Sequence, residues 1–109
     1  MTHSSVTAAL TAIACDAHAD ATRRGILPQP ISRSMDDIGD EYQELLEAWA
    51  NARWGNPDAR AAVADEAADV ILTTLTTMIE LGVDPGRVIV AKWLANQSRG
   101  PRRNHEDQS

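Results

Sequence analysis

Glycine and proline occur at regular places in this chain and divide it into four segments. Each of four glycines ends a stretch with apolar residues at helical spacing, and a proline follows within three residues: Gly25 and Pro28, Gly55 and Pro57, Gly82 and Pro85, Gly100 and Pro101. A glycine just past the last turn closes a helix, and a proline cannot continue one. The pattern predicts an all-α chain of four helices.

Local signals predict where these helices begin. The first is expected from about Ser5 to Arg24, and the second from Ser34, where Asp37 three residues later approximates a capping box. The pairs Asn56-Pro57 and Asp84-Pro85 have the residue types of an N-cap followed by N1, so the third and fourth helices are expected to begin there. The third would run to about Leu81. Its stretch 70–79 is rich in β-branched residues, but it lies between capping signals and is therefore predicted to be helical.

Length and composition exclude several classes of protein. The 109 residues suit a single domain, expected over residues 1–100, followed by a flexible polar tail over 101–109. A net charge of -6 disfavours nucleic-acid binding, and a single cysteine excludes a disulfide framework or a CxxC zinc site. The sequence contains no apolar run of about 18 residues and no signal-peptide pattern, so we expect a cytoplasmic protein that does not bind membranes.

The third segment indicates that the chain forms a homo-oligomer. Residues 70–79 are apolar or threonine around most of the helix circumference. Such a helix needs neighbours on several sides, and a thin bundle of four helices cannot supply them all. A second copy of the chain would complete the bundle, as a dimer or a tetramer.

Two pairs of acidic residues at a spacing of three are predicted to face each other. Glu41 and Glu44 precede the second glycine by about three turns, and Glu66 and Asp69 follow it by a similar length. Because a short connection makes the two helices antiparallel neighbours, the pairs would meet at one height. Either these acids form a solvated face, or a cation with oxygen ligands such as Mg²⁺ lies between them.

The fourth segment carries a cationic face. Lys92, Asn96 and Arg99 recur at i, i+4 and i+7 and therefore share one side of the helix. Two cations with an amide between them suit phosphate oxygens. The alternative interpretation is ordinary solvation, together with a favourable interaction of Arg99 with the helix C-terminus.

Taken together, three motifs resemble those of the MazG-like all-α nucleoside triphosphate pyrophosphohydrolases. They are the acidic stretches 40–45 (DEYQEL) and 65–70 (DEAADV) and the pattern Lys92-x-x-x-Asn96-x-x-Arg99. The resemblance implies a helical bundle completed by oligomerisation. It also implies Mg²⁺-dependent cleavage of an NTP or dNTP to the monophosphate and pyrophosphate, a reaction that serves house-cleaning of the nucleotide pool.

The resemblance also implies roles for individual residues. Glu41, Glu44, Glu66 and Asp69 would bind Mg²⁺, or Mn²⁺ in its place, and Glu41 or Glu44 would activate the attacking water. The phosphate groups would be held by Lys92, Asn96 and Arg99. Trp54 is the candidate for stacking on the base.

Three alternatives remain open at this stage. Ala67-Ala68 before Asp69 also resembles the related phosphoribosyl-ATP pyrophosphohydrolases, although those typically have a histidine shortly after this motif, where this chain has Thr73 and Thr74. A helical assembly module without catalysis would keep the fold and lose the metal dependence. A di-metal redox bundle normally uses Glu-x-x-His pairs, and these acidic motifs contain no histidine.

Overall fold

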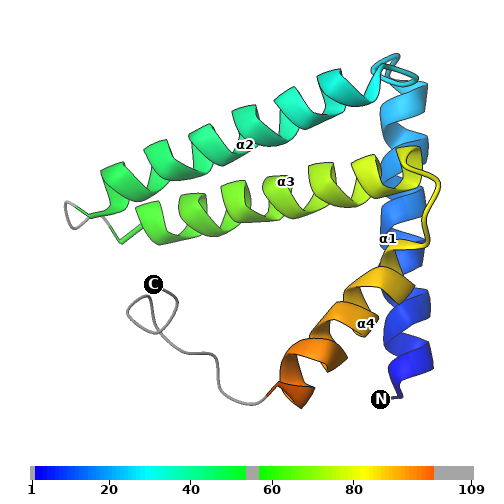
Figure 1. Cartoon of the computed structure of the whole chain (residues 1–109). Coiled ribbons are helices and arrows are strands. Elements are labelled where there is room, and N and C mark those ends of the chain that lie inside the picture. Colours follow the sequence, from blue (N-terminus) through cyan, green and yellow to red (C-terminus); the bar gives the residue numbers. More distant parts are fainter. Residues whose placement is uncertain (1, 54–56, 100–109) are drawn as a thin grey trace, which may run out of the picture.

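The computed structural model describes residues 2–53 and 57–99 of the chain, and it confirms the all-α expectation. Figure 1 shows the four helices: α1 (His3–Arg23), α2 (Ile31–Ala52), α3 (Ala59–Glu80) and α4 (Pro85–Ser98). The described residues contain no strand. None of the described helices is long and apolar enough to cross a membrane.

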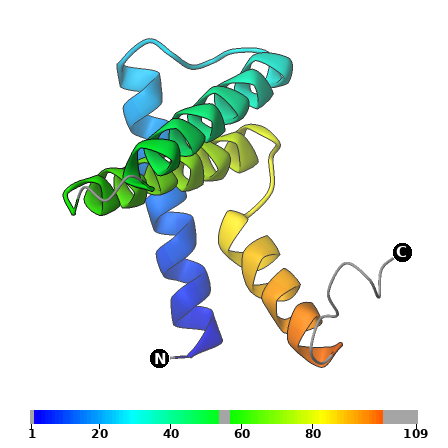
Figure 2. The same cartoon turned by 90° about the vertical axis from the view of Figure 1, so that its left-hand side faces the viewer.

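The helices form two unequal parts. α2 and α3 run antiparallel and side by side, and α1 packs across the end of α3, close to where the α1–α2 link leads into the start of α2 (Figure 1). α4 packs beside the N-terminal half of α1 and leads away from the α2–α3 pair, as the perpendicular view in Figure 2 also shows. Within the described residues, α4 makes no contact with α2.

Several of the expected helix ends are confirmed. Gly25 and Gly82 both have a φ of +78°, the left-handed conformation that closes a helix and that other residues rarely adopt. Asp84 caps α4 by accepting a hydrogen bond from the backbone N–H of Arg87, and Pro85 occupies the first helical position. At the other end of the chain, α1 begins with a capping box at Thr2, slightly before the expected start.

The predicted starts of α2 and α3 were wrong. α2 begins at Ile31, directly after Pro30, so Ser34 lies inside the first turn, where it is buried. α3 begins at Ala59, so Pro57 precedes the helix and is not its first residue. The rigid ring of Pro30 starts α2 without a side-chain cap, and a cap is therefore not needed at Ser34. Gly55, Asn56 and the tail from Gly100 lie outside the described residues.

The buried core of one chain is small. Its buried apolar residues come from α1, the α1–α2 link, α3 and α4: Ala14, Leu27, Leu75, Pro85 and Val90. In contrast, one side of α2 carries a row of large apolar residues that are 40–54% exposed: Met35, Tyr42, Leu46 and Trp49. We call these four residues the apolar stripe of α2. A single chain leaves all four of these side chains largely in solvent.

Candidate active site

The antiparallel pairing of α2 and α3 brings the two acidic motifs together, as their spacing predicts. One carboxylate oxygen each from Glu41, Glu66 and Asp69 lies within 4.8 Å of the other two. Glu41 comes from the middle of α2, and the other two come from the first half of α3. We call these three residues the acidic cluster.

Two oxygens of the acidic cluster are buried and lack a partner. Among the described residues, no group hydrogen-bonds to Oε2 of Glu41 or to Oε2 of Glu66. A buried polar atom without a hydrogen bond is costly, and a buried anion is more so. A bound cation would satisfy both oxygens.

The negative charges of the acidic cluster repel one another. Burial, and then a hydrogen bond and charge repulsion from Glu44, raise the pKa of Glu41 from 4.5 to about 7, with smaller contributions from Asp69 and Glu66. The pKa of Glu66 is also raised, first by burial and then by the charges of Glu44 and Asp69. Glu41 and Glu66 are thus half-buried next to other acids, which is unlike an ordinary solvated face, whereas Glu44 and Asp69 are exposed.

The arrangement of the oxygens fits a hard divalent cation. Mg²⁺ binds oxygen at about 2.1 Å, so ligands on opposite sides of the ion lie about 4.2 Å apart. The oxygens of the acidic cluster all lie within 4.8 Å of one another, so at most a small side-chain rotation would bring them to this spacing. The donor set contains only carboxylate oxygens, which suit Mg²⁺ or Mn²⁺ better than softer metals.

Glu44 stands beside the acidic cluster and has a different environment. Its side chain is exposed, and its carboxylate interacts with both Glu41 and Glu66. It is not one of the three residues whose oxygens converge within 4.8 Å. Of the four predicted ligands, the structure thus brings three into one group and leaves Glu44 at the edge, facing solvent.

A pocket of about 720 Å³ adjoins the acidic cluster. Its walls come from the end of α1, the link to α2, the first half of α2 and the second half of α3. Glu41, Glu44 and Asp69 line one part of it, and apolar and polar side chains line the rest, among them Ile26, Leu72, Gln29 and Ser34. This volume is in the range of about 300–1,000 Å³ typical of small-molecule sites.

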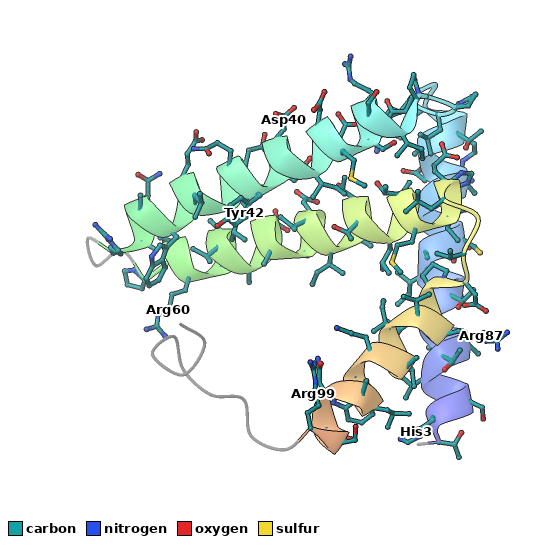
Figure 3. All side chains as sticks on the ribbon, in the orientation of Figure 1. His3, Asp40, Tyr42, Arg60, Arg87 and Arg99 are labelled. Carbon is teal, nitrogen blue, oxygen red and sulfur yellow. The ribbon has the colours of Figure 1, made fainter. Side chains whose placement is uncertain are left out.

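The predicted phosphate ligands lie elsewhere. Lys92, Asn96 and Arg99 belong to α4 or its C-terminal cap, and none of them lines the pocket. Figure 3 shows Arg99 at the far end of α4, away from the α2–α3 pair. Within one chain, these residues do not reach the acidic cluster. Trp54, the candidate for base stacking, lies outside the described residues.

Several polar residues that line the pocket belong to none of the sequence motifs, among them Arg24, Gln29 and Arg33. Arg24 and Arg33 are exposed and lie 3.3 Å from Asp20 and 3.8 Å from Asp37, respectively. Gln29 lies in the link between α1 and α2, which the sequence indicates only as an extended connection. Their shared position depends on how this link folds over α2, and no spacing rule reports that.

A comparison with protein-family models identifies the chain's relatives. The model for phosphoribosyl-ATP pyrophosphohydrolase matches residues 17–91, which include both acidic motifs and every helix in whole or in part. The chain belongs to this family. The family is part of the MazG-like all-α superfamily, which confirms the resemblance stated above. No curated protein and no solved structure matches the sequence.

Membership in the phosphoribosyl-ATP pyrophosphohydrolase family makes this chain a pyrophosphohydrolase that acts on an acid anhydride. The match is to the branch that Ala67-Ala68 before Asp69 resembles. The acidic cluster is the part of the described structure that suits the metal dependence typical of the family. Thr73 and Thr74 occupy α3 one turn after Asp69, where a histidine would be typical.

The raised pKa values predict how the metal-free protein responds to pH. Folding keeps a proton on Glu41 up to about pH 7, whereas the unfolded chain releases it near 4.5. The free energy of unfolding in EDTA is therefore expected to fall as the pH rises through this window. Thermal denaturation at pH 5, 6 and 7 measures it. Glu41→Gln should flatten this pH dependence of stability. Glu47→Gln changes an exposed acid outside the cluster and should leave it unchanged. An unchanged slope in Glu41→Gln would contradict the raised pKa of Glu41.

Proposed function

We propose that this protein hydrolyses nucleoside triphosphates between the α and β phosphates in a Mg²⁺-dependent reaction, with house-cleaning of the nucleotide pool as its role. The observation that supports this most is the acidic cluster beside the pocket, with two buried carboxylate oxygens that have no protein partner. A protein that only assembled with others would gain stability by losing these charges.

The acidic residues would have two different roles in this reaction. Mg²⁺, when bound, would polarise the phosphate group and lower the pKa of a bound water. Glu41, Glu66 and Asp69 would hold the ion, because their oxygens already converge. Glu44 is exposed to the pocket next to them, so it is the better candidate for accepting the proton of the attacking water. The proton moves to Glu44 as the water oxygen attacks the α-phosphorus, and pyrophosphate leaves.

Two substrates share this reaction. The lack of a histidine after the second acidic motif favours an ordinary NTP or dNTP, whereas the family match favours phosphoribosyl-ATP. Phosphoribosyl-ATP carries a second phosphate far from its triphosphate. Arg24 and Arg33 line the pocket on the side of the α1–α2 link, where they suit such a group. Both substrates therefore belong in the first assay.

We propose that the working form is a homo-oligomer. The apolar stripe of α2 and Ile71 of α3, which is 59% exposed, leave large apolar side chains in solvent in a single chain. Covering them with a second copy is the simplest way to remove this surface from water. The same association would allow Lys92 and Asn96 of one chain to approach the acidic cluster of another, which they do not reach within a single chain.

A charge in the apolar stripe should separate the subunits. Leu46 is 40% exposed and lies between Tyr42 and Trp49 on α2, so Leu46→Glu would put a carboxylate into the proposed interface. We expect the molar mass in solution, measured by light scattering after gel filtration, to drop to that of one chain, and activity to fall with it. The matched control is Ala50→Glu, at an exposed position of α2 outside the stripe. A wild-type protein that is already monomeric would contradict the proposed assembly.

The function is tested by product analysis. Wild-type protein is incubated with each of the eight common NTPs and dNTPs and with phosphoribosyl-ATP, in Mg²⁺ or in EDTA, and the products are separated. The proposal expects a monophosphate and pyrophosphate in Mg²⁺ only. Orthophosphate with a diphosphate would show that a different bond is cleaved. An absence of turnover with all substrates would favour the assembly module.

A further inference from the structure

Gln29 is held in a fixed position at the wall of the pocket. It stands between Pro28 and Pro30 in the link from α1 to α2, and its side chain is half-buried. Its amide nitrogen Nε2 donates one hydrogen bond to Oγ of Ser34 at 3.0 Å and another to Oδ2 of Asp37 at 2.9 Å. Two flanking prolines and two hydrogen bonds leave this side chain little freedom.

These contacts identify which atom of the Gln29 side-chain amide is the nitrogen and which is the oxygen. A carboxylate only accepts hydrogen bonds, so the atom beside Asp37 must be the amide nitrogen and not the oxygen. Both N–H groups of that nitrogen are then in use. The oxygen Oε1 remains as an acceptor, and no described residue donates to it. It is also not among the buried atoms without a partner, so part of it is exposed, and Gln29 is one of the residues that line the pocket.

Gln29 lies at a useful distance from the acidic cluster. Asp37, which holds its amide, precedes Glu41 by one turn of α2, and a helix rises about 1.5 Å per residue, or about 6 Å over this interval. Gln29 is therefore held about one helical turn along α2 from Glu41, at the wall of the same pocket that Glu41 lines. Apolar surface is present in the same pocket from Ile26 and Leu72, which are 44% and 39% exposed.

We infer that Oε1 of Gln29 accepts a hydrogen bond from the exocyclic amino group of the substrate's base, so that the site prefers adenine or cytosine to bases with a keto oxygen at that position. This inference rests on the proposed function, because it names the base of the nucleotide cleaved at the acidic cluster. A keto oxygen against Oε1 would place two hydrogen-bond acceptors next to each other, so neither would have a partner. The cost of these unpartnered groups disfavours the keto base and gives the site its selectivity. The nitrogen on C6 of phosphoribosyl-ATP also carries a hydrogen, so both an adenine nucleotide and phosphoribosyl-ATP can donate a hydrogen bond to Oε1 of Gln29.

A purely structural role for Gln29 makes a different prediction. If the residue only ties the link to the start of α2, its loss would weaken the turnover of all nucleotides by the same factor. The ratio of kcat/KM between an amino base and its keto counterpart would then not change. This ratio is therefore the readout, since a general loss of stability or of metal binding cancels from it.

The experiment compares two substrate pairs, ATP with ITP and CTP with UTP, whose members differ at the amino or keto position. Wild-type protein is expected to prefer the amino member of at least one pair by about tenfold in kcat/KM, roughly the value of one hydrogen bond. Gln29→Met keeps the length of the side chain and should bring that ratio close to one. Gln29→Lys replaces the acceptor with a donor and should favour the keto member. Gln43→Met, the same change at an exposed position of α2 outside the pocket, should leave the ratio unchanged.

The outcomes separate the two proposals. If wild-type protein cleaves nucleotides without an amino preference, or if Gln29→Met keeps the preference, the inference is overturned and the proposed function stands. If wild-type protein cleaves only phosphoribosyl-ATP, the four nucleotides are compared as competitive inhibitors of that reaction, and the same preference is expected in their inhibition constants. If no nucleotide or phosphoribosyl-ATP is cleaved, the proposed function fails and the role of Gln29 fails with it.

Discussion

Replacing Asp69 by asparagine is expected to lower kcat/KM for pyrophosphate release by about a thousandfold or more. Asp69 contributes one of the three carboxylate oxygens that converge within 4.8 Å, and it also lines the pocket. An amide there removes one negative charge and one strong ligand from a centre that would stabilise several charges in the transition state. A loss of about 4 kcal/mol in that stabilisation corresponds to a thousandfold change in rate.

The same substitution should not destabilise the metal-free fold. Removing one charge relieves repulsion on Glu41 and Glu66, so the melting temperature in EDTA should stay the same or rise. The increase in melting temperature that Mg²⁺ gives the wild-type protein should disappear, since the ion stabilises only by binding the native state. Activity assays and thermal denaturation with and without Mg²⁺ measure both effects.

A matched variant on the same helix controls for general effects of charge. Asp65→Asn makes the same chemical change one turn earlier on α3, at an exposed residue outside the acidic cluster. It should keep most of the activity and the response to Mg²⁺. Full activity in Asp69→Asn would contradict the proposed role of Asp69 as a metal ligand. If Asp69→Asn failed to fold, Glu41→Gln tests the same centre from α2.

Replacing Gly86 by alanine is expected to destabilise the protein by about 3 kcal/mol, because the start of α4 packs directly on the backbone of α1. A Cβ at residue 86 would overlap the carbonyl group of Thr7 and lie 2.6 Å from Oγ1 of Thr11. The backbone of α1 cannot move aside as a flexible side chain would. Chemical denaturation and the melting temperature measure the loss, which we expect to be about 10 °C or more.

The hydrogen bonds around Gly86 explain why α4 cannot simply shift. The backbone N–H of Gly86 donates to Oγ1 of Thr11 at 3.1 Å, and the hydroxyl of Thr11 donates to the Asp84 carboxylate. The latter bond is the main reason that the pKa of Asp84 is held below its usual value. A displaced α4 would lose both of these bonds to Thr11. Unchanged stability in Gly86→Ala would show that this close packing is absent in solution.

Gly39 provides the opposite control. It lies inside α2, where a Cβ would meet nothing within 4 Å. Gly39→Ala should therefore stabilise the protein by about 0.5–1 kcal/mol, since alanine loses less backbone entropy in a helix. The contrast between the two glycines depends only on packing, because both substitutions add one methyl group within a helix.

The acidic cluster could be predicted from local rules, whereas the pocket beside it could not. The acids at 41, 66 and 69 follow helix periodicity, and a short connection brings two helices back along each other. Gln29 and Arg33 line the pocket because α1 packs across the end of α3 and the α1–α2 link then leads back to the start of α2. That packing depends on contacts between residues far apart in the sequence, which periodicity does not encode.

By itself, the sequence determined the four helices, the ends marked by Gly25 and Gly82, the cap at Asp84, and the meeting of the acidic motifs. Each of these depends on interactions within a few residues or on one short connection, so residue types and spacing are sufficient. The tertiary structure decided the start of α2, the exposure of its apolar stripe and the position of α4 away from the acidic cluster. These depend on which surfaces the rest of the chain covers, and only the packing of distant helices determines that.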